Sequence, residues 1–180
     1  MAKPWLSMLE AEFWPAGGGR RAAWMIADGA RDRRVYPCLL ASHLSHSCLY
    51  SGPLAPELEL AAPYLVQLEP DDRETRQLVE QAWGNSWGVF LQCDSPVEQL
   101  RHHLRGLLIV KDDAGKQLAF RYYDPRVLRV FLPTCAAKEL ETLFGPVTRF
   151  ILEEAGGAAA GVFQFDGANL VRRQVVLAPC

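Results

Sequence analysis

Cysteine and histidine are the residue types in this chain whose side chains could act as nucleophiles or metal ligands. The five cysteines are widely spaced, and no two of them form a Cys-x-x-Cys pair. Cys93 follows an expected strand, and Cys135 begins an expected helix, whose N-terminus can lower a thiol pKa. No motif connects either thiol to a histidine, so scattered core cysteines are the simpler interpretation. A small cysteine-dependent enzyme stays open as an alternative.

The spacing of possible ligand residues gives little indication of a metal or cofactor site. His43 and His46 are three residues apart, but no carboxylate or cysteine stands at a suitable spacing beside them. His102 and His103 are adjacent on an expected helix, so their side chains diverge. The sequence contains no phosphate-binding or dinucleotide-binding glycine motif and no Gly-x-Ser-x-Gly nucleophile motif. We expect no catalytic residue, no metal and no cofactor.

Arginine and tyrosine are concentrated around one aspartate in a short segment, which comprises Arg121, Tyr122, Tyr123, Asp124 and Arg126. In one interpretation, Arg121 or Arg126 pairs with Asp124 and holds a corner between a strand and a helix. In the other, the arginines and tyrosines are anchors for a protein partner, because these types dominate interface hot spots. We favour the structural pair, since an unpaired half-buried arginine is costly.

Two tryptophans stand close together upstream of this segment. Trp83 and Trp87 follow an expected helix that Asp71 caps, with Glu74 as its capping-box partner, and Gly84 ends that helix. Large aromatic side chains dominate the packing of protein cores. We expect both tryptophans to be packing anchors beside the arginine and tyrosine corner.

Local patterns along the chain predict strands that alternate with helices. An apolar run over residues 22–27 predicts a buried strand, and residues 95–98 combine serine, proline and glutamate at a helix start. Residues 107–111 and 117–123 predict a hairpin around the turn 112–115. Because a hairpin interrupts the alternation, we expect an α/β (α+β) fold, a mixed β-sheet with flanking helices in a single compact domain.

The main domain is expected to span residues 1–155. Residues 156–161 are all glycine or alanine, which indicates a linker. Residues 156–180 are then expected to be this linker with a short C-terminal extension, in which residues 162–177 could form a β-hairpin.

Composition and charge exclude several classes of protein. The chain has 180 residues, of which 49% are hydrophobic, and a formal net charge of −2. This charge is too small to concentrate a polyanion, so we expect no nucleic-acid partner. No apolar run reaches membrane-spanning length, and no signal-peptide pattern is visible. With an odd number of scattered cysteines, these features predict a cytoplasmic protein without a membrane partner.

The sequence resembles the type VI secretion adaptor (effector chaperone) family, whose members are called Tap or Tec proteins and were long catalogued only as a domain of unknown function. The resemblance is carried by three segments, Phe120–Leu128, Phe131–Pro133 and Phe144–Val147. Upstream segments agree in order and spacing, namely Ala61–Val66, Trp83-Gly84 with Trp87-Gly88, and Leu100–Arg105, which contains Arg101, His103 and Arg105. The similarity covers approximately residues 24–152.

This resemblance implies a cytoplasmic adaptor that binds a toxin effector, through the N-terminal region of the effector, and helps to load it onto the VgrG spike. The family is not known as an enzyme, so no catalytic residue is carried over. Many members continue into a second lobe, whereas here residues 153–180 follow the shared region, which leaves open where an effector binds. A self-associating scaffold is a further alternative.

Overall fold

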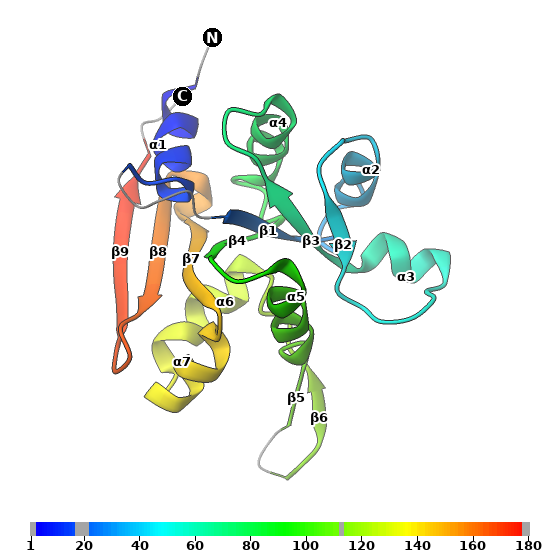
Figure 1. The fold of residues 1–180 in the computed structure, drawn as a ribbon, viewed down its shortest axis with the longest axis vertical. Coiled ribbons are helices and arrows are strands. Elements are labelled where there is room, and N and C mark those ends of the chain that lie inside the picture. The colour runs from blue at the N-terminus through cyan, green and yellow to red at the C-terminus, as the bar shows by residue number, and fades with distance from the viewer. Residues whose placement is uncertain (1–2, 17–21, 112–113, 178–180) are drawn as a thin grey trace.

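The computed structural model describes residues 3–16, 22–111 and 114–177. Its helices are α1 (Pro4–Phe13), α2 (Val35–Leu40), α3 (Pro56–Ala61), α4 (Arg73–Ala82), α5 (Val97–Gly106), α6 (Pro125–Phe131) and α7 (Ala137–Phe144), with the 3-10 turns η1 (Leu132–Thr134) and η2 (Ala155–Gly157). Its strands are β1 (Ala22–Asp28), β2 (His46–Cys48), β3 (Pro63–Leu68), β4 (Gly88–Cys93), β5 (Ile109–Lys111), β6 (Gln117–Ala119), β7 (Val147–Glu154), β8 (Ala159–Phe165) and β9 (Leu170–Val176). Figure 1 shows the hairpin β5–β6 extending away from the rest of the molecule.

The main sheet has seven strands in the order β2-β3-β1-β4-β7-β8-β9, and β5 and β6 form a separate two-stranded sheet. In the central strand β1, Met25 pairs with Val66 of β3 and with Phe90 of β4. The expected α+β domain, a sheet with flanking helices, is confirmed. The mixed strand directions are not found, because every ladder between described strands is antiparallel. Strands joined by tight turns, as β7, β8 and β9 are, must run antiparallel.

Alternating residues of the central strands face two different cores. Met25 belongs to one cluster of buried side chains, whereas Trp24 and Ile26 belong to the other. The first face of the sheet is covered by α1, α2 and α4, which contribute Leu9, Leu39 and Leu78. The second face is covered by α5, α6 and α7, which contribute Leu104, Leu128 and Leu143. The sheet therefore lies between two layers of helices (Figure 1).

The helices begin close to the expected positions, but two caps differ. The Oδ1 atom of Asp72 accepts a hydrogen bond from the Thr75 amide at 2.7 Å and caps α4. The expected cap, Asp71, is wrong, because this residue has φ 58° and lies in the turn before the helix. Ser95 precedes Pro96, the residue at the cap position of α5, and no side-chain hydrogen bond caps that helix. Among the described residues, no helix is long and apolar enough to cross a membrane.

The C-terminal segment belongs to the main sheet. Residues 156–161, expected to form a linker, instead complete the turn η2 and begin β8. β8 pairs with β7 along five residue pairs, and β9 pairs with β8 as a hairpin along seven. The predicted hairpin is thus present over 159–176, but it extends the sheet. Gly156 and Gly157 both have positive φ, which allows the tight turn between β7 and β8.

The predicted hairpin over residues 107–123 is present in shortened form as β5 and β6. Ile109 pairs with Ala119, and Lys111 pairs with Gln117. Gly115 has φ 78°, a left-handed conformation that favours glycine. Asp112 and Asp113, the first residues of the predicted turn, lie outside the described residues.

The close approach of β4 to β1 gives a test of the sheet. A Cβ atom at Gly88 would overlap the carbonyl oxygen of Ile26. We expect Gly88→Ala to lower the free energy of unfolding in urea by about 2 kcal/mol or more, since overpacking forces the backbone to shift. Gly106→Ala is the matched control, because no atom lies within 4 Å of the added Cβ. The control should be neutral or stabilising, and equal losses in both variants would contradict this account of the sheet.

Candidate functional site

Arg121 connects the end of β6 to the centre of the main sheet. Its Nη2 atom forms a short ion pair with Oδ2 of Asp28, the last residue of β1. The Asp28 side chain is fully buried, whereas that of Arg121 is about half exposed. Burial raises the pKa of Asp28, and the hydrogen bond and charge of Arg121 oppose this shift. The arginine therefore supplies the counter-charge of a carboxylate that has no access to water.

Asp124 and Arg126 form the second ion pair of the corner. Asp124 Oδ1 accepts hydrogen bonds from the Arg126 amide at 2.9 Å and from its Nε at 3.0 Å, and Oδ2 accepts one from Nη2 at 2.6 Å. Burial raises the pKa of Asp124, but the hydrogen bonds from Arg126 outweigh burial and hold it below its usual value. The corner pair is thus Asp124 with Arg126, and Arg121 takes a partner from β1 that the sequence did not reveal.

The two tyrosines of the segment belong to its framework. Tyr122 is fully buried, and its hydroxyl donates a hydrogen bond to the Leu104 carbonyl at 2.8 Å. Tyr123 is also buried, and the Arg121 guanidinium lies 5.9 Å from its ring centroid. Burial raises the pKa of both phenols. Both rings pack in the core on the second face of the sheet and so hold the corner segment in place.

The predicted α5 residues divide between three places. Arg105 donates hydrogen bonds to three successive carbonyls at the C-terminal end of β2, those of Cys48, Leu49 and Tyr50, at 3.0–3.2 Å. The His103 ring bonds to the Leu143 carbonyl at 3.0 Å, and burial lowers the pKa of this histidine. Arg101 lies elsewhere, beside a small pocket that Trp24 and His46 also line. Arg105 also lines a groove together with the corner residue Tyr123.

Trp83 and Trp87 belong to the core on the first face, and the corner packs on the second face. Trp83 Nε1 donates to the Gly157 carbonyl at 2.8 Å. Trp87 is connected to the corner through its backbone, since its carbonyl accepts a hydrogen bond at 2.7 Å from the amide of Asp28, the partner of Arg121. The packing role of both tryptophans agrees with their burial, but Trp83 does not lie beside the corner.

A buried carboxylate that sequence reasoning missed holds the loop between these tryptophans. Glu153 of β7 accepts hydrogen bonds from the amides of Gly84 and Ser86 at 2.8 and 3.1 Å, and from the Ser86 hydroxyl at 2.7 Å. Its position 67 residues beyond Ser86 leaves no local signal. The only hint in the sequence was that Glu153 and Glu154 are adjacent. Both are buried, and buried carboxylates need hydrogen-bond donors.

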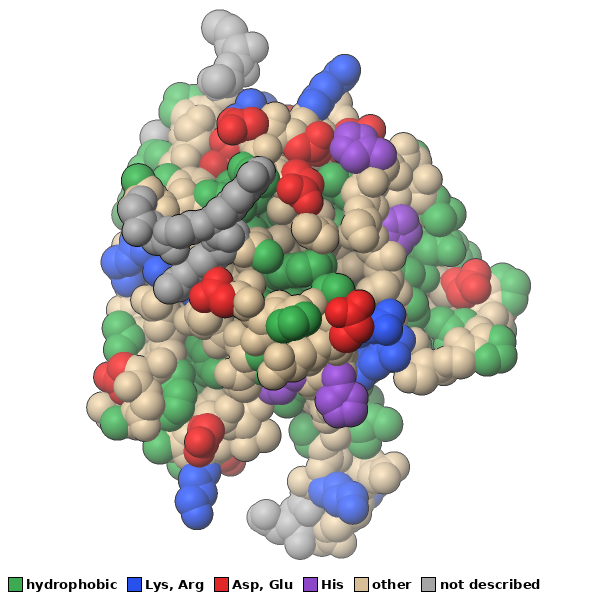
Figure 2. Space-filling model, viewed as in Figure 1, with side chains coloured by type: hydrophobic (Ala, Val, Ile, Leu, Met, Phe, Trp, Pro, Cys, Tyr) green, Lys and Arg blue, Asp and Glu red, His purple; other side chains and the backbone are tan. Residues whose placement is uncertain are grey.

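The hairpin β5–β6, which we call the arm, carries apolar side chains outside the body of the protein. Ile109, Val110 and Leu118 are 58%, 37% and 41% exposed. At the root of the arm, Phe120 packs against Phe131 of α6 with ring centroids 4.8 Å apart. Figure 2 shows the arm standing clear of the body, with hydrophobic side chains where the two meet and basic side chains farther out. The corner that follows β6 fixes this root.

Two grooves flank the root of the arm. The arm groove, about 460 Å³, lies between the arm and α6–α7 and is lined by Leu107, Val110, Phe120, Phe131 and Leu143, with Lys111, Lys138, Glu139 and Thr142 as its polar residues. The corner groove, about 470 Å³, lies on the other side and is lined by Tyr50, Arg105, Ile109, Phe120 and Tyr123 among others. Apolar floors with a few charged groups are suited to holding a peptide segment.

The described cysteines show no sign of activation. Burial raises the pKa of Cys38, Cys48, Cys93 and Cys135, so their thiols are protonated at neutral pH. Cys180 lies outside the described residues. Within the ranges that the structure describes, no three His, Cys, Asp or Glu residues are grouped so as to hold a metal ion.

Comparison with known proteins places most of the chain in one family. Residues 23–142 match the model of a family described as a domain of unknown function (DUF4123). No curated protein and no solved structure matches the chain. The matched residues run from β1 into α7 and include the arm and the corner, whereas β7, β8 and β9 lie beyond them.

The Arg121–Asp28 pair gives a prediction with a defined pH dependence. Arg121→Ala leaves a buried carboxylate without its counter-charge and should cost about 3 kcal/mol at pH 7. Because the pKa of Asp28 is already raised in the folded protein, the loss should be small at pH 4 and should grow only as the pH rises above this raised folded-state pKa, where the carboxylate is charged. Urea unfolding at both pH values measures it. Adding Asp28→Asn should restore part of the stability, and a double variant no better than Arg121→Ala would contradict the pairing.

The Asp124 carboxylate both caps α6 and pairs with Arg126. Asp124→Ala should lower the free energy of unfolding by about 1–2 kcal/mol at pH 7. Asp124→Asn keeps a cap acceptor and should lose less, since the arginine is half exposed. The lowered pKa means that this contribution is present at pH 7 and is lost as the pH falls below 3.8. A melting temperature unchanged in the alanine variant would show that the carboxylate has no structural role.

Proposed function

Because this chain belongs to the DUF4123 family, we propose that it is a type VI secretion adaptor, an effector chaperone that binds a toxin effector and promotes its loading onto the VgrG spike. The family match gives no activity by itself. The proposal rests on the resemblance carried by the corner segment and on the architecture around that segment. In this proposal the protein works in the bacterial cytoplasm and catalyses no reaction.

The observation that supports this function best is the apolar arm. An isolated two-stranded hairpin is marginally stable in water, so this arm depends on its root for stability. Phe120, Tyr122 and the Arg121–Asp28 pair supply that root. Exposed apolar groups such as the cross-strand pair Val110 and Leu118 are typical of protein-interaction sites when the element that carries them is supported. A chaperone needs such a surface in order to cover an apolar segment of its client.

The groove beside the arm indicates the chemistry of the client segment. Val110 and Phe131 offer apolar contacts, and full burial of such a side chain contributes about 1.5–3 kcal/mol. Lys111 and Lys138 lie on the same groove with one carboxylate, Glu139, and this excess of positive charge favours acidic residues beside the apolar ones. We infer an amphipathic effector segment, with acidic residues flanking its apolar side chains, and assign it to the N-terminal region of the effector.

The alternatives draw less support from the structure. A cysteine-dependent enzyme needs a thiolate, whereas burial raises the pKa of Cys93 and Cys135, the two thiols singled out from the sequence. A self-associating scaffold would use the same apolar arm, but each copy of the arm groove carries two lysines and one glutamate, so two copies would bring net positive charges together. The adaptor function accounts for both the apolar and the basic side chains.

The experiment co-expresses the chain with the proteins encoded by adjacent genes and measures complex formation by size-exclusion chromatography and calorimetry. Leu118→Glu on the arm should weaken effector binding by on the order of tenfold or more, because a charge replaces an apolar contact. Val171→Glu on β9 is the control, since Val171 is 45% exposed and Leu118 is 41% exposed. The control should bind as the unmodified protein does.

Two results would argue against the proposal. One is the absence of any complex with an effector or spike protein, combined with normal effector delivery after deletion of the gene. The other is equal binding by the Leu118 and Val171 variants, which would move the client surface away from the arm. Melting temperatures of both variants establish that they are folded.

A further inference from the structure

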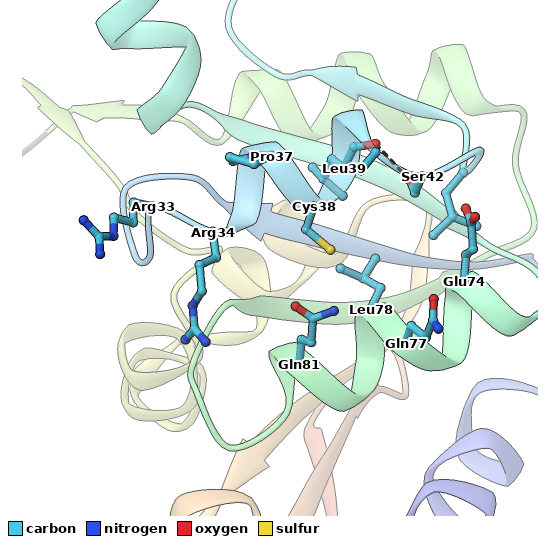
Figure 3. A pocket seen from close by; sticks show the side chains of 12 residues that line it. Arg33, Arg34, Pro37, Cys38, Leu39, Ser42, Glu74, Gln77, Leu78 and Gln81 are labelled. Carbon is cyan, nitrogen blue, oxygen red and sulfur yellow. Dashed lines mark hydrogen bonds between the residues drawn. The ribbon is translucent and has the colours of Figure 1, made fainter.

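A groove of about 590 Å³ lies between α2 and α4, on the first face of the sheet. The arm and its grooves join the helices of the second face, so the two surfaces use different sides of the molecule. In Figure 3, α2 and α4 form the two walls, and side chains from both walls point toward the space between them. None of the residues in this groove takes part in the corner or the arm.

The floor of the groove is apolar. Leu39, Leu44 and Leu78 line it and are almost fully buried. The Cys38 thiol points from α2 toward α4 (Figure 3), and burial, together with the nearby charge of Glu74, raises the pKa of this thiol. A neutral thiol behaves as a small apolar group, so the floor accepts an apolar side chain.

Two amide side chains stand on the α4 wall. Gln77 and Gln81 are one helical turn apart and line the groove with their side chains (Figure 3). Both are exposed, and within the described part of the chain neither side-chain amide forms a hydrogen bond. Each amide offers two donors and an acceptor, the groups that an unpaired peptide backbone requires.

The two ends of the groove differ in charge. At one end, Arg33 is exposed and has no ion-pair partner among the described residues. Arg34 beside it is already bound to Asp32 at 2.6 Å and lies 5.3 Å from the centroid of the Trp87 ring. At the other end, Glu74 accepts a hydrogen bond from the His43 amide at 2.6 Å. The groove therefore carries an exposed positive charge at the Arg33 end and a carboxylate at the Glu74 end, so an acidic group is favoured at the Arg33 end.

We propose that this groove binds an extended acidic peptide segment of a partner protein, with a carboxylate at Arg33 and an apolar side chain on the floor. Glu74 and Gln81 are seven positions apart, which spans about 10 Å of helix and matches about three residues of extended chain. A partner helix, about 10–12 Å wide, would already have its backbone groups paired, so it would leave the glutamine amides without hydrogen-bond partners. The free amides of Gln77 and Gln81 match an extended segment better.

The test uses the full chain and an array of acetylated hexapeptides in which a glutamate and a leucine are placed at varied spacings, with lysine replacing glutamate in the reference set. Binding is then measured by fluorescence anisotropy for the best sequences. We expect the glutamate peptides to be preferred. Arg33→Glu should lower the affinity for the glutamate peptides about tenfold, which corresponds to about 1.4 kcal/mol of binding free energy. Arg101→Glu makes the same charge change on α5, outside the groove, and should leave binding unchanged.

A second readout locates the bound peptide. Saturating peptide should slow the alkylation of Cys38 by a maleimide, whereas Cys135, which is also partly exposed, should react at an unchanged rate. Equal binding of glutamate and lysine peptides would overturn the proposal, and so would full reactivity of Cys38 at saturation. Neither readout involves an effector or the arm, so this inference and the adaptor function can fail separately.

Discussion

The ion pair between Arg121 and Asp28 is the contact on which the rest of the molecule depends. Asp28 ends the interior strand β1 and has no access to water, so burying its charge is too costly without a partner. That partner comes from the root of the arm, 93 residues farther along the chain. This ion pair thus neutralises the buried carboxylate of Asp28 at the end of β1. It also holds the root of the arm against the main sheet.

The same strand end is tied to the opposite side of the sheet. The Asp28 amide donates to the carbonyl of Trp87, the Trp87 indole donates to Asp32 at 3.2 Å, and Asp32 holds Arg34. Hydrogen bonds from Arg34 hold the pKa of Asp32 well below its usual range. A continuous set of polar contacts therefore runs from the root of the arm to the groove between α2 and α4. Both exposed surfaces are supported by buried or half-buried groups that already have partners.

The sequence predicts contacts within a few residues well and contacts across the fold poorly. The pairing of Asp124 with Arg126 and the hairpin at the arm are local, and both are present. The partner of Arg121 could not be predicted, because nothing near Asp28 indicates which distant side chain will approach it. Strand direction and the place of residues 156–176 in the sheet also depend on tertiary pairing. Even the cap of α4 at Asp72 differs by one residue, since two adjacent aspartates have the same propensity.

The alternation of side chains along β1 has a consequence for assembly. Met25 and Ile26 are neighbours in sequence, yet they face helical layers on opposite sides of the sheet. The arm and the groove between α2 and α4 therefore also lie on opposite sides of the sheet. Two proteins held at these places would be stacked in series with the present chain as the spacer, and neither would compete with the other for room.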